Sequence, residues 1–174
     1  TAGRGPALHD ISARVAAIGL ENISNIAKQA FDPDFDVVPL WYGEGDLSTP
    51  ALVGNAVHQA IRDGHTFYAH QNGIPLLREA LSDYYNGLYP LALAPDRFTI
   101  TSGGMQAIML AVKLLVETGD NVIVIDPVWP NIGGMVQVAG GEVRSVRMDL
   151  GPMGWTLDVE KVRAACDGRT RAIF

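Results

Sequence analysis

The sequence predicts an α/β fold built on a mainly parallel sheet. Residues 98–125 have the pattern of a strand, a tight turn, a helix and a second strand. The second strand, at 122–125, is apolar without alternation, which is typical of a strand covered on both faces in a parallel sheet. After Trp129 helical and extended patterns continue to alternate up to residue 174. Such alternation indicates a sheet with helices packed against it.

The segment ahead of this unit is predicted to be mostly helical. Residues 1–7 are expected to form a loose arm. Residues 11–30 carry apolar side chains at roughly helical spacing and are expected to form one helix or two short ones. Residues 37–41 are expected to be extended and to lead into a glycine-flanked loop.

Two further helices are predicted before the central unit. Thr49 is expected to be the N-cap of the first, with Pro50 in its first turn and Gly64 at its end. Residues 65–72 show no period and are expected to form a loop. The second helix is predicted over 75–89, where apolar residues recur on one face.

The turn of the central unit contains two consecutive glycines, Gly103 and Gly104. Residues without a Cβ let the backbone turn sharply and come close to a ligand. The first-turn N–H groups of the helix that follows have no intrahelical partners and lie at the positive end of the helix dipole. A phosphate at residues 103–106 would meet both donors and favourable charge. The alternative is a tight strand-to-helix turn without a ligand.

The strand at 122–125 ends shortly before Trp129, so a large aromatic lies at the carboxyl edge of the predicted sheet, where ligands of open α/β sheets collect. By itself this residue could equally be a core aromatic. The elements predicted beyond it are a helix at 132–139 closed by Gly140 and Gly141, a strand at 142–148, a turn at 151–154, a helix capped by Asp158 that ends at Cys166, and a strand from Arg171.

The composition is that of an ordinary globular protein, with 48% apolar and 18% charged residues. A formal charge of -6 without a basic cluster argues against binding of nucleic acid or of an anionic membrane. No apolar run reaches the roughly 18 residues that a membrane span needs. The single cysteine, Cys166, leaves no disulfide or metal-ligand pair and is expected to be a small buried hydrophobe. We therefore expect a cytoplasmic protein without a metal site.

Four separated motifs occur in order along the chain. They are Gly43-Glu44-Gly45-Asp46 followed by Thr49-Pro50; Thr66-Phe67-Tyr68 followed by Gly73 and Leu77-Arg78; Thr101-Ser102-Gly103-Gly104-Met105-Gln106-Ala107; and Gly119-Asp120 before the strand that leads to Asp126-Pro127-Val128-Trp129-Pro130-Asn131. Each is weak alone, but the four together are specific. In them the sequence resembles the class I/II (aspartate aminotransferase-like) group of fold type I pyridoxal-phosphate-dependent aminotransferases.

The resemblance covers nearly all of residues 38–174 and implies the three-layer αβα fold, with a mainly parallel sheet, of the family's large domain. It assigns residues 47–174 to the first part of this domain, and residues 1–46 to an N-terminal arm and a helical segment of the small domain. It also implies an amino-terminal portion of a longer protein, because the family's Schiff-base lysine belongs downstream of residue 174. No catalytic residue is therefore expected in this chain. Its lysines are expected at the surface: Lys28, Lys113 and Lys161.

The resemblance further implies a cofactor, pyridoxal 5'-phosphate, and roles for particular residues. Backbone groups of Gly103, Gly104 and Met105 would bind its phosphate, in agreement with the argument from the helix terminus. Trp129 would stack on its pyridine ring.

Two residues before the central unit receive roles in the same way. Tyr68 would hydrogen-bond the phosphate of the neighbouring subunit, which implies a homodimer with shared active sites; the alternative is a residue of a solvated loop. Gly43 would lie against the substrate carboxylate.

The implied function is the transfer of an amino group between an α-amino acid and a 2-oxo acid. A pyridoxal-phosphate-dependent carbon–sulfur lyase shares this fold and these residues, and stays open as an alternative. A non-enzymatic regulator with an aminotransferase-like domain is less favoured, because residues 1–37 are short and carry no basic face for DNA. A generic nucleotide-binding protein is weaker still, since the glycine spacing is neither a dinucleotide fingerprint nor a P-loop.

Overall fold

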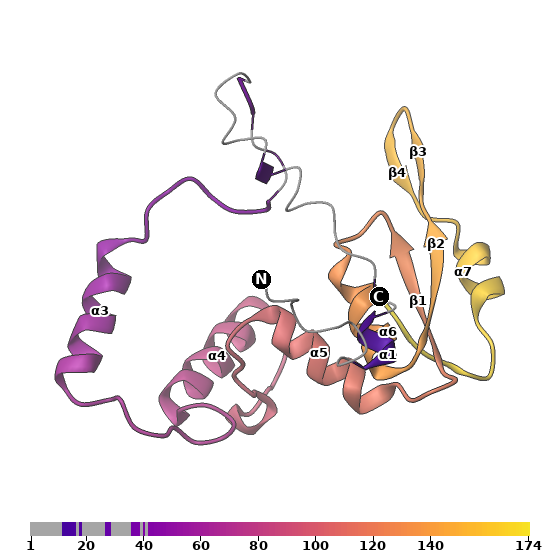
Figure 1. Cartoon of the computed structure of the whole chain (residues 1–174). Coiled ribbons are helices and arrows are strands. Elements are labelled where there is room, and N and C mark those ends of the chain that lie inside the picture. Colours follow the sequence, from indigo (N-terminus) through magenta and orange to yellow (C-terminus); the bar gives the residue numbers. More distant parts are fainter. Residues whose placement is uncertain (1–11, 17, 19–26, 29–35, 39, 41) are drawn as a thin grey trace, which may run out of the picture. The chain divides into compact units, whose positions relative to one another are not determined.

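The computed structural model describes residues 12–16, 18, 27–28, 36–38, 40 and 42–174. The chain divides into two compact units (Figure 1). The sheet unit comprises Thr1–Phe35 and Gly104–Phe174, and the helical unit comprises Asp36–Gly103. The predicted arm at 1–7 and most of the predicted helix at 11–30 lie outside the described residues.

A three-stranded parallel sheet in the order β2-β1-β5 forms the centre of the sheet unit. The strands are β1 (Asn121–Asp126), β2 (Glu142–Arg147) and β5 (Thr170–Ile173). On the central strand β1 Val122, Ile123 and Val124 are at most 3% exposed although their side chains point alternately to the two faces. This burial confirms the prediction from the unbroken apolar run.

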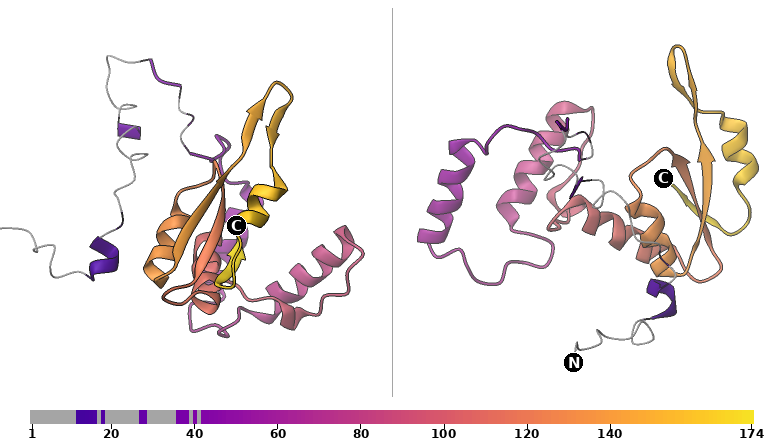
Figure 2. Two further views of the ribbon diagram at one scale, coloured as in Figure 1. Left: turned by 90° about the vertical axis from the view of Figure 1, so that its right-hand side faces the viewer. Right: turned by 45° about the horizontal axis from the view of Figure 1, so that its top comes forward.

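Helices lie on both faces of this sheet. Helix α6 (Asn131–Ala139) connects β1 to β2, and α7 (Val159–Ala165) comes between β2 and β5. Parallel crossovers are right-handed, and β2 and β5 flank β1 on opposite sides, so α6 and α7 must cover opposite faces. Figure 2 shows this arrangement. The αβα layering predicted for the large domain is therefore present.

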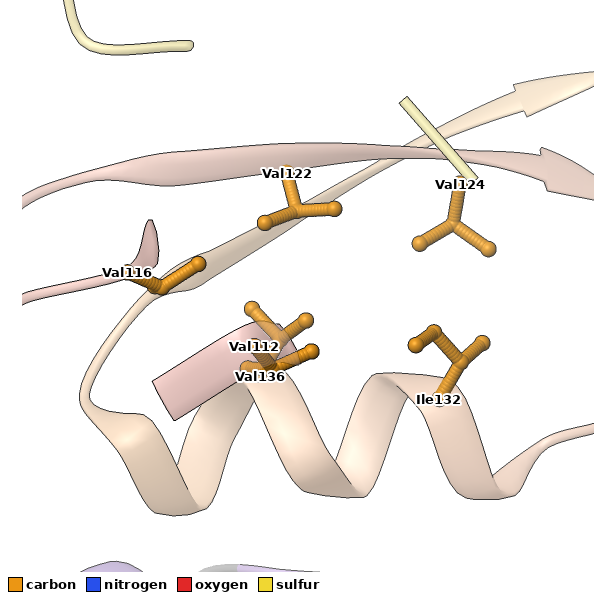
Figure 3. Packing of buried hydrophobic residues seen from close by; sticks show 6 residues of the cluster. All are labelled: Val112, Val116, Val122, Val124, Ile132 and Val136. Carbon is orange, nitrogen blue, oxygen red and sulfur yellow. The ribbon is translucent and has the colours of Figure 1, made fainter. Parts of the chain in front are cut away.

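The hydrophobic core lies between β1, α6 and α5 (Gly104–Leu115). Side chains of β1 and α6 point toward one another in Figure 3. Full burial of a side chain of this size contributes roughly 1.5–3 kcal/mol. The cluster consists of Val112, Val116, Val122, Val124, Ile132 and Val136.

The ends of the helices in the sheet unit follow their local sequence. Helix α6 ends at Gly140, whose φ of 94° is left-handed and favours glycine. Helix α7 begins after Asp158, whose carboxylate accepts hydrogen bonds from the N–H groups of Glu160 at 2.9 Å and Lys161 at 3.4 Å. Both predicted ends are confirmed.

A hairpin and a short helix complete the described part of the sheet unit. The predicted turn at 151–154 connects two short antiparallel strands, β3 (Asp149–Gly151) and β4 (Gly154–Thr156). Helix α1 (Ala13–Ala16) contacts α6. Its Arg14 Nη2 donates a hydrogen bond of 2.8 Å to Thr118 Oγ1.

A polar cluster joins the three strands at the amino end of the sheet. Asn121 of β1 is fully buried; its Nδ2 donates to Asp167 Oδ1 at 2.9 Å and its Oδ1 accepts from Thr170 Oγ1 of β5 at 2.8 Å. Arg144 of β2 forms an ion pair of 2.9 Å with the other oxygen of Asp167. The backbone N–H of Arg169, then Asn121 and Arg144, lower the pKa of Asp167 to about 2.

The helical unit contains α3 (Ala51–Arg62), α4 (Pro75–Leu88) and the short 3-10 helix η3 (Pro95–Arg97). The prediction of Thr49 as N-cap of α3 is wrong by one residue. Pro50 is the N-cap, because its ψ of 140° is extended and helical geometry begins only at Ala51. Gly64 follows the helix with a φ of 80°, as predicted.

The predicted strand at 98–101 is not a strand in this structure. Phe98 has extended backbone angles of -108° and 132°, but no strand pairs with this segment among the described residues. Ile100 N instead donates a hydrogen bond of 3.0 Å to Asn72 O in the preceding loop. The described residues of the segment predicted as extended at 37–41 also form no strand.

The prediction that Cys166 is buried is wrong. This residue is exposed at the end of α7, where Sγ donates to Val162 O at 3.4 Å. The thiol therefore lies along its own helix rather than in the core. No helix in the described part of the chain is long and apolar enough to cross a membrane.

Candidate functional site

The amino-terminal turn of α5 offers main-chain donors to an anion. Gly104 is the first residue of this 12-residue helix and Met105 the second. First-turn N–H groups have no intrahelical acceptors, and the helix dipole adds positive potential there. The first turn contains no acidic residue. An anion at this point meets donors without a competing carboxylate from the same turn.

Space is open beside both glycines of the turn. A Cβ added to Gly103 or Gly104 would meet no other heavy atom within 4 Å. Thr101 Oγ1 donates a hydrogen bond of 3.0 Å to Gly103 O and thereby fixes the chain just before the helix. The space on the Cβ side of these two glycines is therefore not filled by side chains.

Helix α5 contributes to the core that lies against β1 and α6. The last turn of α5 is followed directly by Val116, which belongs to the same core cluster as Val122 of β1. Ile108, near the other end of α5, lines an apolar groove of about 130 Å³ together with Phe174. Phe174 O accepts the N–H of Ile125, at the carboxyl end of β1. The carboxyl end of β1, which leads to Trp129, is the edge at which open α/β sheets bind ligands.

Trp129 lies at the exit of β1, just before α6. Its side chain is 43% exposed, so it is not a buried core aromatic in this structure. The strand end below it is held in place by Met148 N, which donates to Asp126 O at 2.7 Å, and by Ser145 Oγ, which donates to the Asp126 carboxylate. A partly exposed indole on a fixed strand end can receive a flat ring.

Gly104 and Met105 begin α5 and Trp129 follows β1, so these three residues belong to the sheet unit. The other predicted site residues, Gly43, Tyr68 and Gly103, belong to the helical unit. Tyr68 is fully exposed in the predicted loop, and a Cβ added to Gly43 would meet nothing within 4 Å.

One interaction at the carboxyl end of β1 is not apparent from the sequence. The hydrogen bond from Ser145 to Asp126 crosses from β2 to β1, and it depends on the register that places Asp126 opposite Arg147. The acidic residue before Pro127 is visible in the sequence, but its partner follows only from strand pairing.

The donor groups of α5 and the indole of Trp129 suit pyridoxal phosphate. Main-chain N–H groups at a helix start match a phosphate, and an exposed indole matches a planar heteroaromatic ring. Lys161 belongs to another region, where the Asp149 carboxylate at 2.9 Å raises its pKa, and Lys113 is exposed. No group of three or more metal-ligating side chains occurs among the described residues.

The chain is similar in sequence to known aminotransferases. The family described as aminotransferase class I and II matches residues 37–174. The aspartate/prephenate aminotransferase of Thermus thermophilus is 39% identical over 138 residues, which are 79% of this chain and 36% of that protein. The probable aspartate aminotransferase of Methanocaldococcus jannaschii is 30% identical over 139 residues, covering 80% and 36% of the two chains. The chain thus spans little more than a third of the length of these relatives.

Solved structures show the same similarity. The Thermus thermophilus aspartate aminotransferase with maleate matches with a TM-score of 0.83 and 35% identity, over 98% of this chain and 44% of that one. The Thermotoga maritima aspartate aminotransferase matches with a TM-score of 0.85 and 29% identity, over 94% and 44%. Since the family match extends over most of the sequence and the fold agrees, this chain belongs to the class I and II aminotransferases.

Proposed function

We propose that the complete protein is a pyridoxal-phosphate-dependent aminotransferase that moves an amino group between an α-amino acid and a 2-oxo acid. One observation carries this proposal: a chain of this family has a helix start at α5 that can donate to a phosphate, and an exposed indole directly after β1. The relatives described above are named as aminotransferases, which favours transfer over the carbon–sulfur lyase reaction. We further propose a cytoplasmic homodimer, in which residues 47–174 begin the large domain.

In this proposal the residues of the chain bind and orient the cofactor. The N–H groups of Gly103, Gly104 and Met105 donate to its phosphate at the start of α5. Trp129 would stack on its ring, hold the ring plane and keep water from the stacked face. Pyridoxal phosphate, when bound, supplies an electron sink for negative charge at the substrate Cα.

We propose roles for two further residues, Gly43 and Tyr68, both of which belong to the helical unit. Gly43 leaves room for the substrate carboxylate, because it has no side chain. Tyr68 would donate a hydrogen bond from its hydroxyl to the cofactor phosphate of the neighbouring subunit.

The test is spectroscopic. The complete protein is loaded with pyridoxal phosphate and titrated with a panel of amino acids that includes aspartate. We expect the visible absorbance to fall and to return when a 2-oxo acid is added, because amino transfer proceeds in two half-reactions. An unchanged spectrum across the panel contradicts the proposal. Release of ammonia without an oxo-acid acceptor would favour the lyase instead.

A further inference from the structure

Gly73 and Ile100 pack against each other unusually closely in the helical unit. Gly73 has a left-handed φ of 99°. A Cβ added there would overlap Ile100 Cγ1 and lie 2.7 Å from Ile100 Cβ. Beside this contact Ile100 N donates a hydrogen bond of 3.0 Å to Asn72 O. Backbone geometry and packing therefore both require glycine at position 73.

A second attachment holds the same segment two residues earlier. Arg78 of α4 donates from Nε to two main-chain oxygens, Pro95 O and Phe98 O, each at 3.0 Å. A guanidinium that bridges two carbonyls fixes their relative position. The segment at 98–100 is thus held by α4 at one end and by the Gly73 loop at the other.

This segment leads directly into the glycine turn. Ile100 is followed by Thr101, whose hydroxyl donates to Gly103 O. Because Ile100 is bonded directly to Thr101, a displacement of Ile100 would also move Thr101 and change its hydrogen bond to Gly103 O. Hydrogen bonds from main-chain donors weaken steeply as their angles deteriorate, so a small displacement of the turn lowers its affinity for an anion.

We propose that Gly73 is a positioning residue for the cofactor: its contact with Ile100 sets the path of the chain into the turn at Gly103 that binds the phosphate. The inference rests on the proposed function. Gly73 itself touches neither substrate nor cofactor in this proposal, and it acts through Ile100.

The experiment compares Gly73→Ala with Gly64→Ala in the complete protein. Gly64 also has a left-handed φ, of 80°, but a Cβ there would meet nothing within 4 Å. Both variants therefore carry similar backbone strain, and only Gly73→Ala displaces Ile100. We expect the dissociation constant for pyridoxal phosphate, measured by equilibrium dialysis, to rise about ten- to a hundredfold in Gly73→Ala, the effect of one charge-assisted hydrogen bond. In Gly64→Ala it should change less than about twofold on the same scale.

Ile100→Ala provides an independent variant should Gly73→Ala fail to fold. It removes most of the side chain that packs against Gly73, so the path of the chain into the turn is less well fixed. We therefore expect weaker cofactor binding without loss of the folded state. In the double variant the Ala side chain at position 73 no longer meets Ile100 Cγ1, and the two effects on binding should be less than additive. Melting temperatures of the cofactor-free proteins separate a general loss of stability from a displaced turn.

Three outcomes would overturn the inference. Equal affinities in Gly73→Ala and Gly64→Ala would refute the contact as a positioning device, as would unchanged binding in Ile100→Ala. If the wild-type protein binds no pyridoxal phosphate, the proposed function fails and the inference fails with it. If the wild-type protein and the Gly73→Ala variant bind pyridoxal phosphate with the same high affinity, the proposed function stands and only the inference about Gly73 fails.

Discussion

Trp129 is the residue whose side chain makes the sheet edge suitable for a ring rather than for a simple anion. Its partial exposure of 43% leaves indole surface for stacking. We expect Trp129→Leu to weaken pyridoxal phosphate binding by about two- to tenfold, because an aromatic pair contributes roughly 0.5–1.5 kcal/mol beyond its burial. The measurement is a fluorescence or dialysis titration of the complete protein.

A second exposed tryptophan provides the control for this change. Trp155 lies on β4 opposite Leu150 and is 51% exposed. Trp155→Leu should leave cofactor binding unchanged. If Trp129→Leu and Trp155→Leu weaken pyridoxal phosphate binding equally, Trp129 does not stack on the cofactor ring.

At the scale of secondary-structure elements, the polar cluster at the amino end of the sheet joins three strands through Asp167. Since the folded-state pKa of Asp167 is lowered from 3.8 to about 2, the ionised carboxylate stabilises the fold above pH 3.8, and this contribution is lost as the pH falls toward 2. We expect Asp167→Asn to lower the melting temperature at pH 7. The difference in melting temperature between Asp167→Asn and the wild-type protein should become smaller as the pH falls below 3.8.

Asp83, an exposed carboxylate of α4, serves as the matched control. Asp83→Asn should give the wild-type melting temperature at every pH tested. A pH-independent deficit in Asp167→Asn would show that its ionisation does not stabilise the sheet.

Several elements whose bounds follow from nearby residues were predictable, whereas the lack of strand pairing around Ile100 was not. The helix end at Gly140 and the cap at Asp158 follow from local chemistry, and the burial of Val122 to Val124 follows from an unbroken apolar run. The extended segment around Ile100 shows no pairing in this structure, because a strand needs a neighbour that the local sequence does not specify.

The candidate site shows the same division. Its glycines and Trp129 were recognisable because the helix start and the aromatic belong to short contiguous motifs. The contact of Gly73 with Ile100 and the hydrogen bond from Ser145 to Asp126 each join residues far apart along the chain. Such pairs appear only when the backbone is folded.

At the scale of the whole molecule, the proposed homodimer makes a specific prediction about Tyr68. Removing its hydroxyl in Tyr68→Phe should weaken pyridoxal phosphate binding about ten- to a hundredfold, the effect of a hydrogen bond to a charged group. Tyr84→Phe, at an exposed tyrosine of α4, should have no effect. Sedimentation of the complete protein should give a dimer.

Mixed dimers test whether Tyr68 acts across the interface. A dimer of one Tyr68→Phe subunit and one Trp129→Leu subunit should contain one site with both residues intact and one site lacking both. Half of the sites in such dimers should then bind with wild-type affinity. If Tyr68 acts within its own subunit, no site recovers.

The contact between Arg14 and Thr118 has a consequence for biosynthesis. The two residues are separated by 104 positions in the sequence, and the whole helical unit is synthesised between them. At translation rates of about 5–20 residues per second, α1 leaves the ribosome roughly 5–20 seconds before its packing partners exist. Docking of α1 onto α6 is therefore a late step on the nascent chain. Until α6 has been synthesised, α1 lacks the helix that it packs against in the folded protein.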